Sequence, residues 1–189
     1  MKIATCLCLL LLAGCQATSF QTPPLGAEAD CDPDLVGRWV SVTDAGQPND
    51  ELRLDIDAAC ALAVADFDKG QLREGAPTTL RVGRNATGRY AWVTAGWADA
   101  RFEAKDLQTD PADVYLFRYR IQGSELAVQT VDHNAVAHRI IDAGIPGTVR
   151  SDDRVLANRI TGRARPELLT LPDLFEAEPM RVRRPPEGR

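Results

Sequence analysis

The segment ELRLDIDA, residues 51–58, carries the strongest structural signal in the chain. Its apolar side chains, Leu52, Leu54 and Ile56, alternate with charged ones. A period of two places the apolar side chains on one face of a β-strand and the charged side chains on the other. A register slip of one residue would bury three charged side chains, so the direction in which this strand faces is fixed. We expect it to pack on an interior formed by other strands.

The same alternation extends over residues 35–132 and predicts a series of short strands. They are separated by turn sequences such as Asn85-Ala86-Thr87-Gly88 and Gln122-Gly123-Ser124. Besides residues 51–58, we expect strands at or around Gly37–Trp39, Ala61–Phe67, Leu80–Val82, Arg89–Ala95, Arg101–Leu107, Val114–Ile121 and Glu125–Val131. Short strands joined in chain order predict a mainly β fold, either an antiparallel up-and-down barrel or a strongly twisted open sheet.

After Asp132 the apolar spacing becomes helical. The apolar residues with this spacing are Val136, Ala137, Ile140 and Ile141. Asp132 or Asn134 can cap the start of this helix, and Gly144 ends it. Pro166 suits the first turn of a second short helix. Extended segments are expected at residues 154–161 and 180–183. The C-terminal part therefore adds two short helices to the predicted sheet.

The first residues are typical of an exported protein. Lys2 precedes an apolar run, residues 6–12, that is far shorter than the roughly 20 residues needed to cross a bilayer. Leu12-Ala13-Gly14-Cys15 follows and resembles the bacterial lipobox. This resemblance implies that residues 1–14 are a signal peptide and that Cys15 becomes the lipid-bearing first residue of the mature protein. The alternative is a buried apolar strand that ends in a cysteine.

The residues after Cys15 suggest where the mature protein is held. Gln16 in the second mature position resembles the outer-membrane signal of proteobacterial lipoproteins, which implies a lipid-anchored protein that faces the periplasm. Residues 15–30 contain Pro23-Pro24 and no sustained apolar period, so we expect a flexible tether. Residues 31–184 fit a single domain, and residues 185–189 are expected to be a disordered tail.

The charge of the chain argues against a nucleic-acid partner. The net charge is −5, and loss of Lys2 would bring it to about −6. No block of Lys and Arg interrupts the predicted domain. The basic cluster Arg181–Arg184 runs into Pro185-Pro186, which is typical of a strand end and a solvated tail. The partner that we expect is the membrane, through acylated Cys15, rather than nucleic acid.

Cysteine use agrees with export. Once the signal peptide and the lipid-bearing residue are set aside, the predicted domain keeps Cys31 and Cys60. In an oxidising compartment such a pair forms a disulfide, and a loop of this length stabilises the fold by about 3.5 kcal/mol in the chain-entropy model. A metal pair is the rival interpretation, but two thiols without a matching histidine or carboxylate pattern make a poor zinc site.

We expect no enzymatic activity. His133 and His138 are the two histidines, and their separation turns them about 140° apart on a helix, so they cannot share one face as a zinc pair does. The chain contains no Gly-x-Ser-x-Gly nucleophile elbow. Carboxylates such as Asp66 and Glu103 show no spacing that would bring two of them together as an acid and a base. We predict no catalytic residue, metal ion or cofactor.

The tripeptide Gly37-Arg38-Trp39, preceded by Leu35, is similar to the Gly-x-Trp signature that opens lipocalins and related calycin barrels. This resemblance implies a barrel in which Trp39 plugs the closed end and Gly37 lets the chain pass close beneath it. It also implies an arginine near the last strand that stacks on the indole, for which Arg183 and Arg184 are the candidates. Such a stack contributes about 0.5–2 kcal/mol. Residues 131–184 instead resemble the C-terminal parts of small bacterial lipoproteins, and this second resemblance implies no activity.

The aromatic residues of the predicted domain have two interpretations. They fill a small barrel as ordinary core, or some of them line a pocket for an apolar ligand. The set comprises Trp92, Trp97, Phe102, Tyr115, Phe117 and Tyr119. In the second interpretation, Arg118 or Arg120 lies near the mouth of the pocket and meets a carboxylate or phosphate.

The sequence therefore predicts a non-catalytic outer-membrane lipoprotein with a lipocalin-like barrel that binds a small amphiphilic molecule or lipid. The expected ligand-binding residues are Trp92, Tyr115, Phe117, Arg118 and Tyr119. The alternative is a scaffold of the cell envelope, in which the core is filled and the helical C-terminal part contacts another envelope protein. An interior cavity of roughly several hundred Å³ would favour ligand binding, and a filled interior would favour the scaffold.

Overall fold

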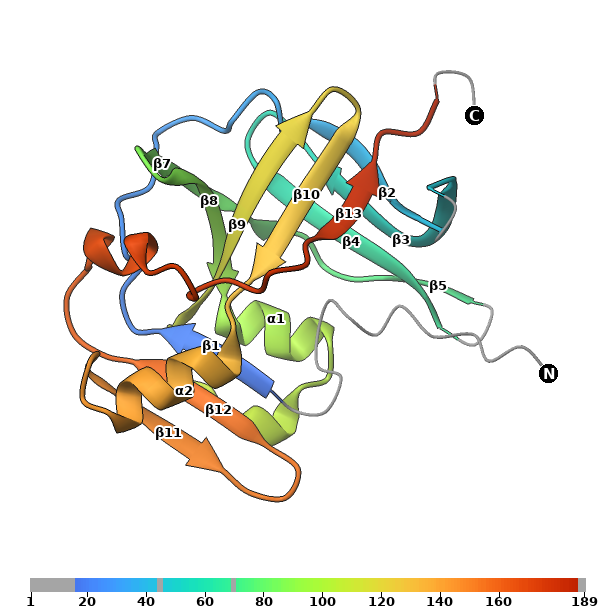
Figure 1. Cartoon of the computed structure of the whole chain (residues 1–189). Coiled ribbons are helices and arrows are strands. Elements are labelled where there is room, and N and C mark those ends of the chain that lie inside the picture. Colours follow the sequence, from blue (N-terminus) through green and yellow to red (C-terminus); the bar gives the residue numbers. More distant parts are fainter. Residues whose placement is uncertain (1–15, 44–45, 69–70, 187–189) are drawn as a thin grey trace.

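The computed structural model describes residues 16–43, 46–68 and 71–186, and this part of the chain is mainly β with two α-helices (Figure 1). The strands are β1 (Gln16–Phe20), β2 (Gly37–Val42), β3 (Pro48–Ile56), β4 (Ala61–Asp68), β5 (Gln71–Glu74), β6 (Thr78–Thr79), β7 (Arg81–Asn85), β8 (Gly88–Thr94), β9 (Val114–Gln122), β10 (Glu125–Thr130), β11 (Gly147–Ser151), β12 (Leu156–Ile160) and β13 (Met180–Arg183). The helical elements are α1 (Ala95–Arg101), α2 (His133–Ile141) and the 3-10 helices η1 (Lys105–Leu107) and η2 (Pro166–Thr170). Cys15, the predicted signal peptide and residues 187–189 of the predicted tail lie outside the described residues.

Strand β3 confirms the prediction made from residues 51–58. It pairs antiparallel with β2 and β4, and Leu54 lies opposite both Trp39 and Val64. Leu52 and Ile56 are buried, whereas the neighbouring Arg53 and Asp55 are half-exposed. The alternation was readable because this strand has one face toward the interior and one toward water.

All described strands belong to one mixed sheet, which does not close into a barrel. Strands β5, β4, β3, β2, β13, β10 and β9 follow one another across it, and β8 and β7 continue beyond β9. The two-residue strand β6 pairs with β4. Leu80 separates β6 from β7, and β7 pairs with β8 and not with β4. Except at this break, the strands predicted to be antiparallel neighbours in chain order are neighbours in the structure. We call the part of the sheet formed by strands β2 to β10 and β13 the curled sheet.

Residues 15–30 were expected to be a flexible tether, but residues 16–20 form a strand of the sheet, and this corrects the prediction for that part of the segment. Strand β1 pairs in parallel with β12, and Phe20 also pairs with Val114 of β9. Farther along, the backbone N–H of Glu28 donates to the carbonyl of Val82 at 2.8 Å. A strand that is covered on both faces shows no polar alternation, which is why the sequence Gln-Ala-Thr-Ser-Phe gave no strand signal.

The helices are predicted in part. Helix α2 is confirmed, and its cap is Asp132, which accepts a hydrogen bond from the backbone N–H of Ala135 at 2.8 Å. The second C-terminal helix is the short 3-10 helix η2, with Pro166 in its first turn. The strand expected at Arg101–Leu107 is wrong, because the chain there ends α1 and forms η1. None of the helices in the described part is long and apolar enough to span a membrane.

Two hydrophobic cores lie on opposite faces of β8 and β9. One is enclosed by the curled sheet and α1, and includes Trp39, Leu52 and Val93. The second lies under α2 and η2, and includes Tyr90 and Trp92. Both faces of β8 are buried. Its large aromatic side chains face the second core, and its small ones, Ala91 and Val93, face the first.

Candidate functional site: an apolar cavity inside the curled sheet

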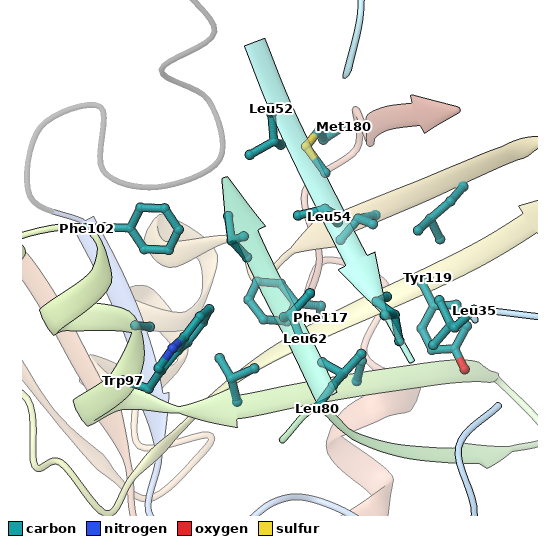
Figure 2. Close-up of a pocket in the computed structure, with 17 residues that line it drawn as sticks. Leu35, Leu52, Leu54, Leu62, Leu80, Trp97, Phe102, Phe117, Tyr119 and Met180 are labelled. Carbon is teal, nitrogen blue, oxygen red and sulfur yellow. The ribbon is translucent and has the colours of Figure 1, made fainter. Parts of the chain in front are cut away.

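The first core is not completely filled. A cavity of about 110 Å³ runs through it (Figure 2). Its lining residues come from α1, from the strands of the curled sheet and from the segments next to them: Leu35, Leu52, Leu54, Ile56, Leu62, Val64, Leu80, Ala91, Val93, Trp97, Ala98, Phe102, Phe117, Tyr119, Leu126, Val128 and Met180. None of these side chains is charged, so the cavity suits an apolar group.

The two ends of the cavity differ in exposure. The partly exposed lining residues, which mark its mouth, are Leu54, Trp97, Phe102, Phe117, Val128 and Met180. Figure 2 shows Trp97 on helix α1 and Phe102 just after it beside the cavity, and Leu35 and Tyr119 at the other end. Leu35, Ile56 and Leu80 are buried and form the base. The cavity is therefore open beside α1 and closed near the start of β2.

The base is closed by the residues of the Gly-x-Trp signature. Trp39 is fully buried, and its indole N–H donates to the carbonyl of Leu35 at 2.8 Å. The guanidinium of Arg184 stacks on the indole, with its central carbon 4.3 Å from the ring centroid. The same guanidinium donates to the carbonyls of Val36 and Asp34, both at 2.9 Å.

Of the two arginines proposed for this stack, Arg184 is the one that forms it. Arg183 instead donates to the carbonyl of Gly46 at 3.1 Å and lies 3.7 Å from a carboxylate oxygen of Glu125. Gly37 has a φ of +127°, and a Cβ atom there would overlap the guanidinium of Arg184. Glycine is therefore required at this position both by the backbone and by the close approach of the arginine.

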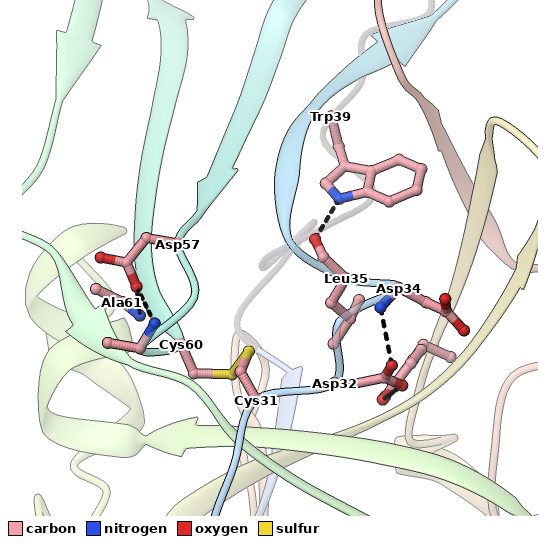
Figure 3. The surroundings of a disulfide bond; sticks show 10 residues. Cys31, Asp32, Asp34, Leu35, Trp39, Asp57, Cys60 and Ala61 are labelled. Atoms are coloured by element: carbon pink, nitrogen blue, oxygen red, sulfur yellow. Dashed lines mark hydrogen bonds between the residues drawn. A yellow bond between two sulfur atoms is a disulfide. The ribbon is translucent and has the colours of Figure 1, made fainter.

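The disulfide predicted between Cys31 and Cys60 is confirmed, with 5.1 Å between the two Cα atoms. Figure 3 shows it joining the segment before β2 to the turn between β3 and β4. Asp57 shapes this turn, because its carboxylate accepts the backbone N–H groups of Ala59 and Ala61, both at 2.8 Å. The disulfide, which packs in the first core, thus joins these two segments near the base of the cavity. Among the described residues, no group of three histidine, cysteine or acidic side chains could hold a metal ion.

Helix α1, which forms one wall of the mouth, is fixed to β4 and β5 by Arg101. This almost fully buried guanidinium donates to the carbonyls of Val64 and Arg73, both at 3.2 Å, and pairs with the carboxylate of Asp66. Burial alone would raise the pKa of Asp66, but the hydrogen bonds and charges of Arg101 and Arg73 outweigh it and hold that pKa below its ordinary value. On α1 itself, the Trp97 indole donates to the carbonyl of Ala76 at 2.8 Å.

Two of the five predicted ligand-binding residues line the cavity. Phe117 and Tyr119 do so from β9, and Trp97 and Phe102, which belong to the same aromatic set, do so from α1. The Tyr119 hydroxyl points out of the cavity and donates to Asp32 at 2.7 Å. Burial and the hydrogen bond to Asp32 raise the pKa of this tyrosine. The hydroxyl is therefore engaged with Asp32 rather than free to meet a ligand.

The other predicted ligand residues lie elsewhere. Trp92 packs in the second core, and Tyr115 donates its hydroxyl to Asp99 at 2.8 Å without lining the cavity. Arg118 extends from the opposite face of β9 to Gln129, at 2.9 Å, and its guanidinium carbon lies 4.8 Å from the ring centroid of Phe175. The alternation that turns Phe117 inward turns Arg118 and Arg120 outward, so neither arginine can meet a ligand at the mouth.

The sequence reasoning missed most of the cavity wall, including Leu52, Leu54 and Met180. The alternation of residues 51–58 predicted that Leu52 and Leu54 lie on the inward face of their strand. It did not predict that this face lines a cavity. The outward arginines instead line a separate polar groove with Arg89 and Arg181.

The two histidines do not form a site. His133 begins α2, and its Nδ1 lies 3.0 Å from the hydroxyl of Thr18 on β1. Burial lowers the pKa of His133 to about 4, while the nearby charge of Asp132 opposes this shift. His138 is exposed. The buried histidine is therefore part of the contact between α2 and β1.

Comparison of the chain with protein-family models, curated proteins and solved structures finds no match to it.

Proposed function

We propose that this chain is a non-catalytic outer-membrane lipoprotein, anchored through Cys15 and facing the periplasm, whose lipocalin-like domain holds the apolar part of a small molecule or lipid. The lipobox-like sequence at residues 12–15 supports the anchor. The disulfide between Cys31 and Cys60 is consistent with an oxidising compartment.

The lipocalin-like description is supported by the base of the curled sheet. Arg184, which follows the last strand, stacks on Trp39 of the first strand of that sheet, and Gly37 makes room for it. Strand β13 pairs with β10 and also with β2, so it joins the first and the last strand, in chain order, of the predicted antiparallel series β2 to β10. The additional strands β1, β12 and β11 are a departure from a simple barrel.

The observation that carries the ligand proposal is the apolar cavity with one open end. Its volume of about 110 Å³ is comparable to the roughly 150 Å³ of an engineered apolar cavity that binds benzene, and smaller than the roughly 300–1,000 Å³ of typical ligand pockets. The ligand is therefore a short apolar molecule or one segment of a hydrocarbon chain, rather than a whole bulky amphiphile.

The affinity from water is expected to be low. Each buried methylene contributes about 0.8 kcal/mol, so a segment of about six carbons gains roughly 5 kcal/mol before the costs of binding. That corresponds to a dissociation constant near 0.2 mM or weaker, about fivefold below 1 mM at best. Because none of the described residues that line the cavity is charged, we expect a carboxylate on the ligand to add nothing to the affinity.

The test is a titration of the soluble protein, residues 16–189, with decanoate and with decanol, followed by tryptophan fluorescence. We expect both ligands to give a saturable change through Trp97 at the mouth. Ala98→Leu fills the cavity from α1 and should abolish the change, whereas the control Ala100→Leu, on the exposed side of the same helix, should not. A change that survives Ala98→Leu, or no saturable change at all, would contradict the proposal.

The alternative, a scaffold of the cell envelope, is favoured by the small size of the cavity and by one surface feature. Phe67 and Leu72 pair across the hairpin of β4 and β5, and both are exposed, at 49% and 41%. Ile141 at the end of α2 is also exposed, at 69%. Adjacent exposed apolar side chains, as on the β4–β5 hairpin, suit a contact with another protein, because contiguous apolar surface marks interaction sites. Absence of saturable binding in the titration would favour this second function.

A further inference from the structure

The first described residue, Gln16, is already part of the sheet. Its partner in the parallel pairing is Leu156 of β12. From Ala17 to Phe20 the strand is at most 7% exposed. On this strand, Ser19 donates to Asp113 at 2.8 Å, and Thr18 accepts a hydrogen bond from Asn158 at 3.0 Å. Strand β1 could not leave the sheet without exposing the second core and several buried polar groups, so it is a fixed point of the domain.

This fixed point lies next to the proposed anchor. Consecutive Cα atoms are about 3.8 Å apart across a trans peptide bond. If Cys15 carries acyl chains, as the proposed function holds, nothing separates the lipid from the folded domain. The edge of the domain around Gln16 must then lie at the headgroup layer, because the acyl chains are inside the bilayer.

The mouth of the cavity belongs to the same edge. Ala17 packs in a small apolar cluster with Ala104, Leu107 and Val155. Ala104 follows the mouth residue Phe102 by two positions. Tyr115 borders this cluster as well, and its hydroxyl bonds Asp99 of α1. In Figure 1, β1 and α1 lie together in the lower half of the molecule, whereas the turn between β9 and β10 lies at the top.

We infer that the domain rests directly on the bilayer with the edge formed by β1, α1 and the β11–β12 turn toward the lipid, so that the cavity takes a hydrocarbon chain from the membrane rather than from the periplasmic fluid. The low affinity expected from water then ceases to be an obstacle. Tethering at a membrane presents acyl chains to the mouth at a very high effective concentration, and no contact beyond the apolar lining is needed.

The orientation is tested with the acylated full-length protein in vesicles of phosphatidylethanolamine and phosphatidylglycerol that contain a nitroxide-headgroup lipid. One fluorescent label is placed at Arg154→Cys, in the turn beside Gln16, and the other at Ser124→Cys, in the β9–β10 turn. Both positions are exposed. We expect several-fold stronger quenching at residue 154 than at residue 124. Equal quenching of the two labels would overturn the inference.

A spacer supplies the matched control. Gln followed by about twenty Gly and Ser residues is inserted between Cys15 and Gln16, which keeps Gln in the second mature position and gives a root-mean-square reach of roughly 25 Å. The difference between the two labels should disappear in this variant. A difference that persists would mean that surface contacts, and not the short link, orient the domain.

The source of the ligand is tested in the same vesicles with lipids brominated in their acyl chains. We expect them to quench Trp97, and we expect both Ala98→Leu and the spacer to reduce this quenching. Quenching that is unchanged by Ala98→Leu would refute uptake of a chain into the cavity. If the labels show the orientation but the soluble protein binds no decanol, ligand binding fails and the orientation stands; the opposite pattern refutes the orientation alone.

Discussion

The packing of Arg184 at the base of the curled sheet is tested most directly by the substitution Gly37→Ala, made in the wild-type protein and in the Arg184→Ala variant. The added methyl group overlaps Nη1 of Arg184, and the φ of +127° at residue 37 is strained for any residue with a side chain. Two separate costs are therefore expected. The backbone strain amounts to about 1–3 kcal/mol. The second cost arises because the arginine must move away.

The second cost can be worked from the contacts of Arg184. Displacement loses its stack on Trp39, which contributes about 0.5–2 kcal/mol, and its two hydrogen bonds to the carbonyls of Val36 and Asp34. Part of the guanidinium remains in contact with water, so we take about 1 kcal/mol for each hydrogen bond. Gly37→Ala should therefore destabilise the wild-type protein by about 3.5–7 kcal/mol. In the Arg184→Ala background only the strain remains, so it should cost about 1–3 kcal/mol.

The assay is urea unfolding of the four proteins of the double-mutant cycle, followed by circular dichroism, with the free energies extrapolated to water. Gly123→Ala is the control, because residue 123 also has a positive φ, of +59°, but has no atom within 4 Å of the added methyl group. We expect a coupling energy of about 2.5–4 kcal/mol between residues 37 and 184, and none between residues 123 and 184. The reasoning is refuted if Gly37→Ala costs the same in both backgrounds.

Three further predictions concern stability. Trp39→Ala should destabilise the protein by about 3–5 kcal/mol, because it removes a fully buried plug, and an unchanged melting temperature would show that the indole is not needed there. Cys31→Ser should lower the stability of the oxidised protein by about 3.5 kcal/mol and leave that of the reduced protein unchanged; equal losses in both forms would rule out the disulfide as the cause. The folded pKa of His133, about 4, lies below its ordinary value of 6.5, so the unfolded chain takes up a proton first and stability is lost as pH falls from about 6.5 to about 4. Urea unfolding at pH 7 and pH 4 should show a loss of up to about 3 kcal/mol from this residue, and His133→Gln should remove that part of the pH dependence, which an unaltered pH profile would disprove.

The sequence predicted strand β3, which has one face in water, and missed strand β1, which has none. Residues 51–58 show the alternation because Arg53 and Asp55 remain in water while their neighbours face the cavity. Strand β1 is covered on both faces and pairs with Leu156–Ile160, far along the chain, so nothing local marked it as a strand. The same physical cause explains why a buried strand was interpreted as a tether.

The candidate site was predicted only as far as the face of each side chain could be inferred. On β9 the alternation correctly placed Phe117 and Tyr119 together and the arginines opposite. On β8 it grouped Tyr90 and Trp92 but could not tell which of two interiors they face, and they belong to the second core. The residues of β8 that line the cavity are the small ones, Ala91 and Val93, which gave no signal of their own.

The start of β9 explains why the proposed anchor and the mouth of the cavity share one edge. The pairing of β10 with β9 ends at Phe117, which leaves the first residues of β9 with a free edge on that side. Strand β1 takes this edge through the pairing of Phe20 with Val114. Helix α1 lies at the same end, because it follows the last residue of β8, Thr94, which pairs with Val114 from the other side. A chain that uses β1 to complete β9 therefore brings this strand to the same end of β9 as the helix that walls the mouth, whatever the identity of the ligand.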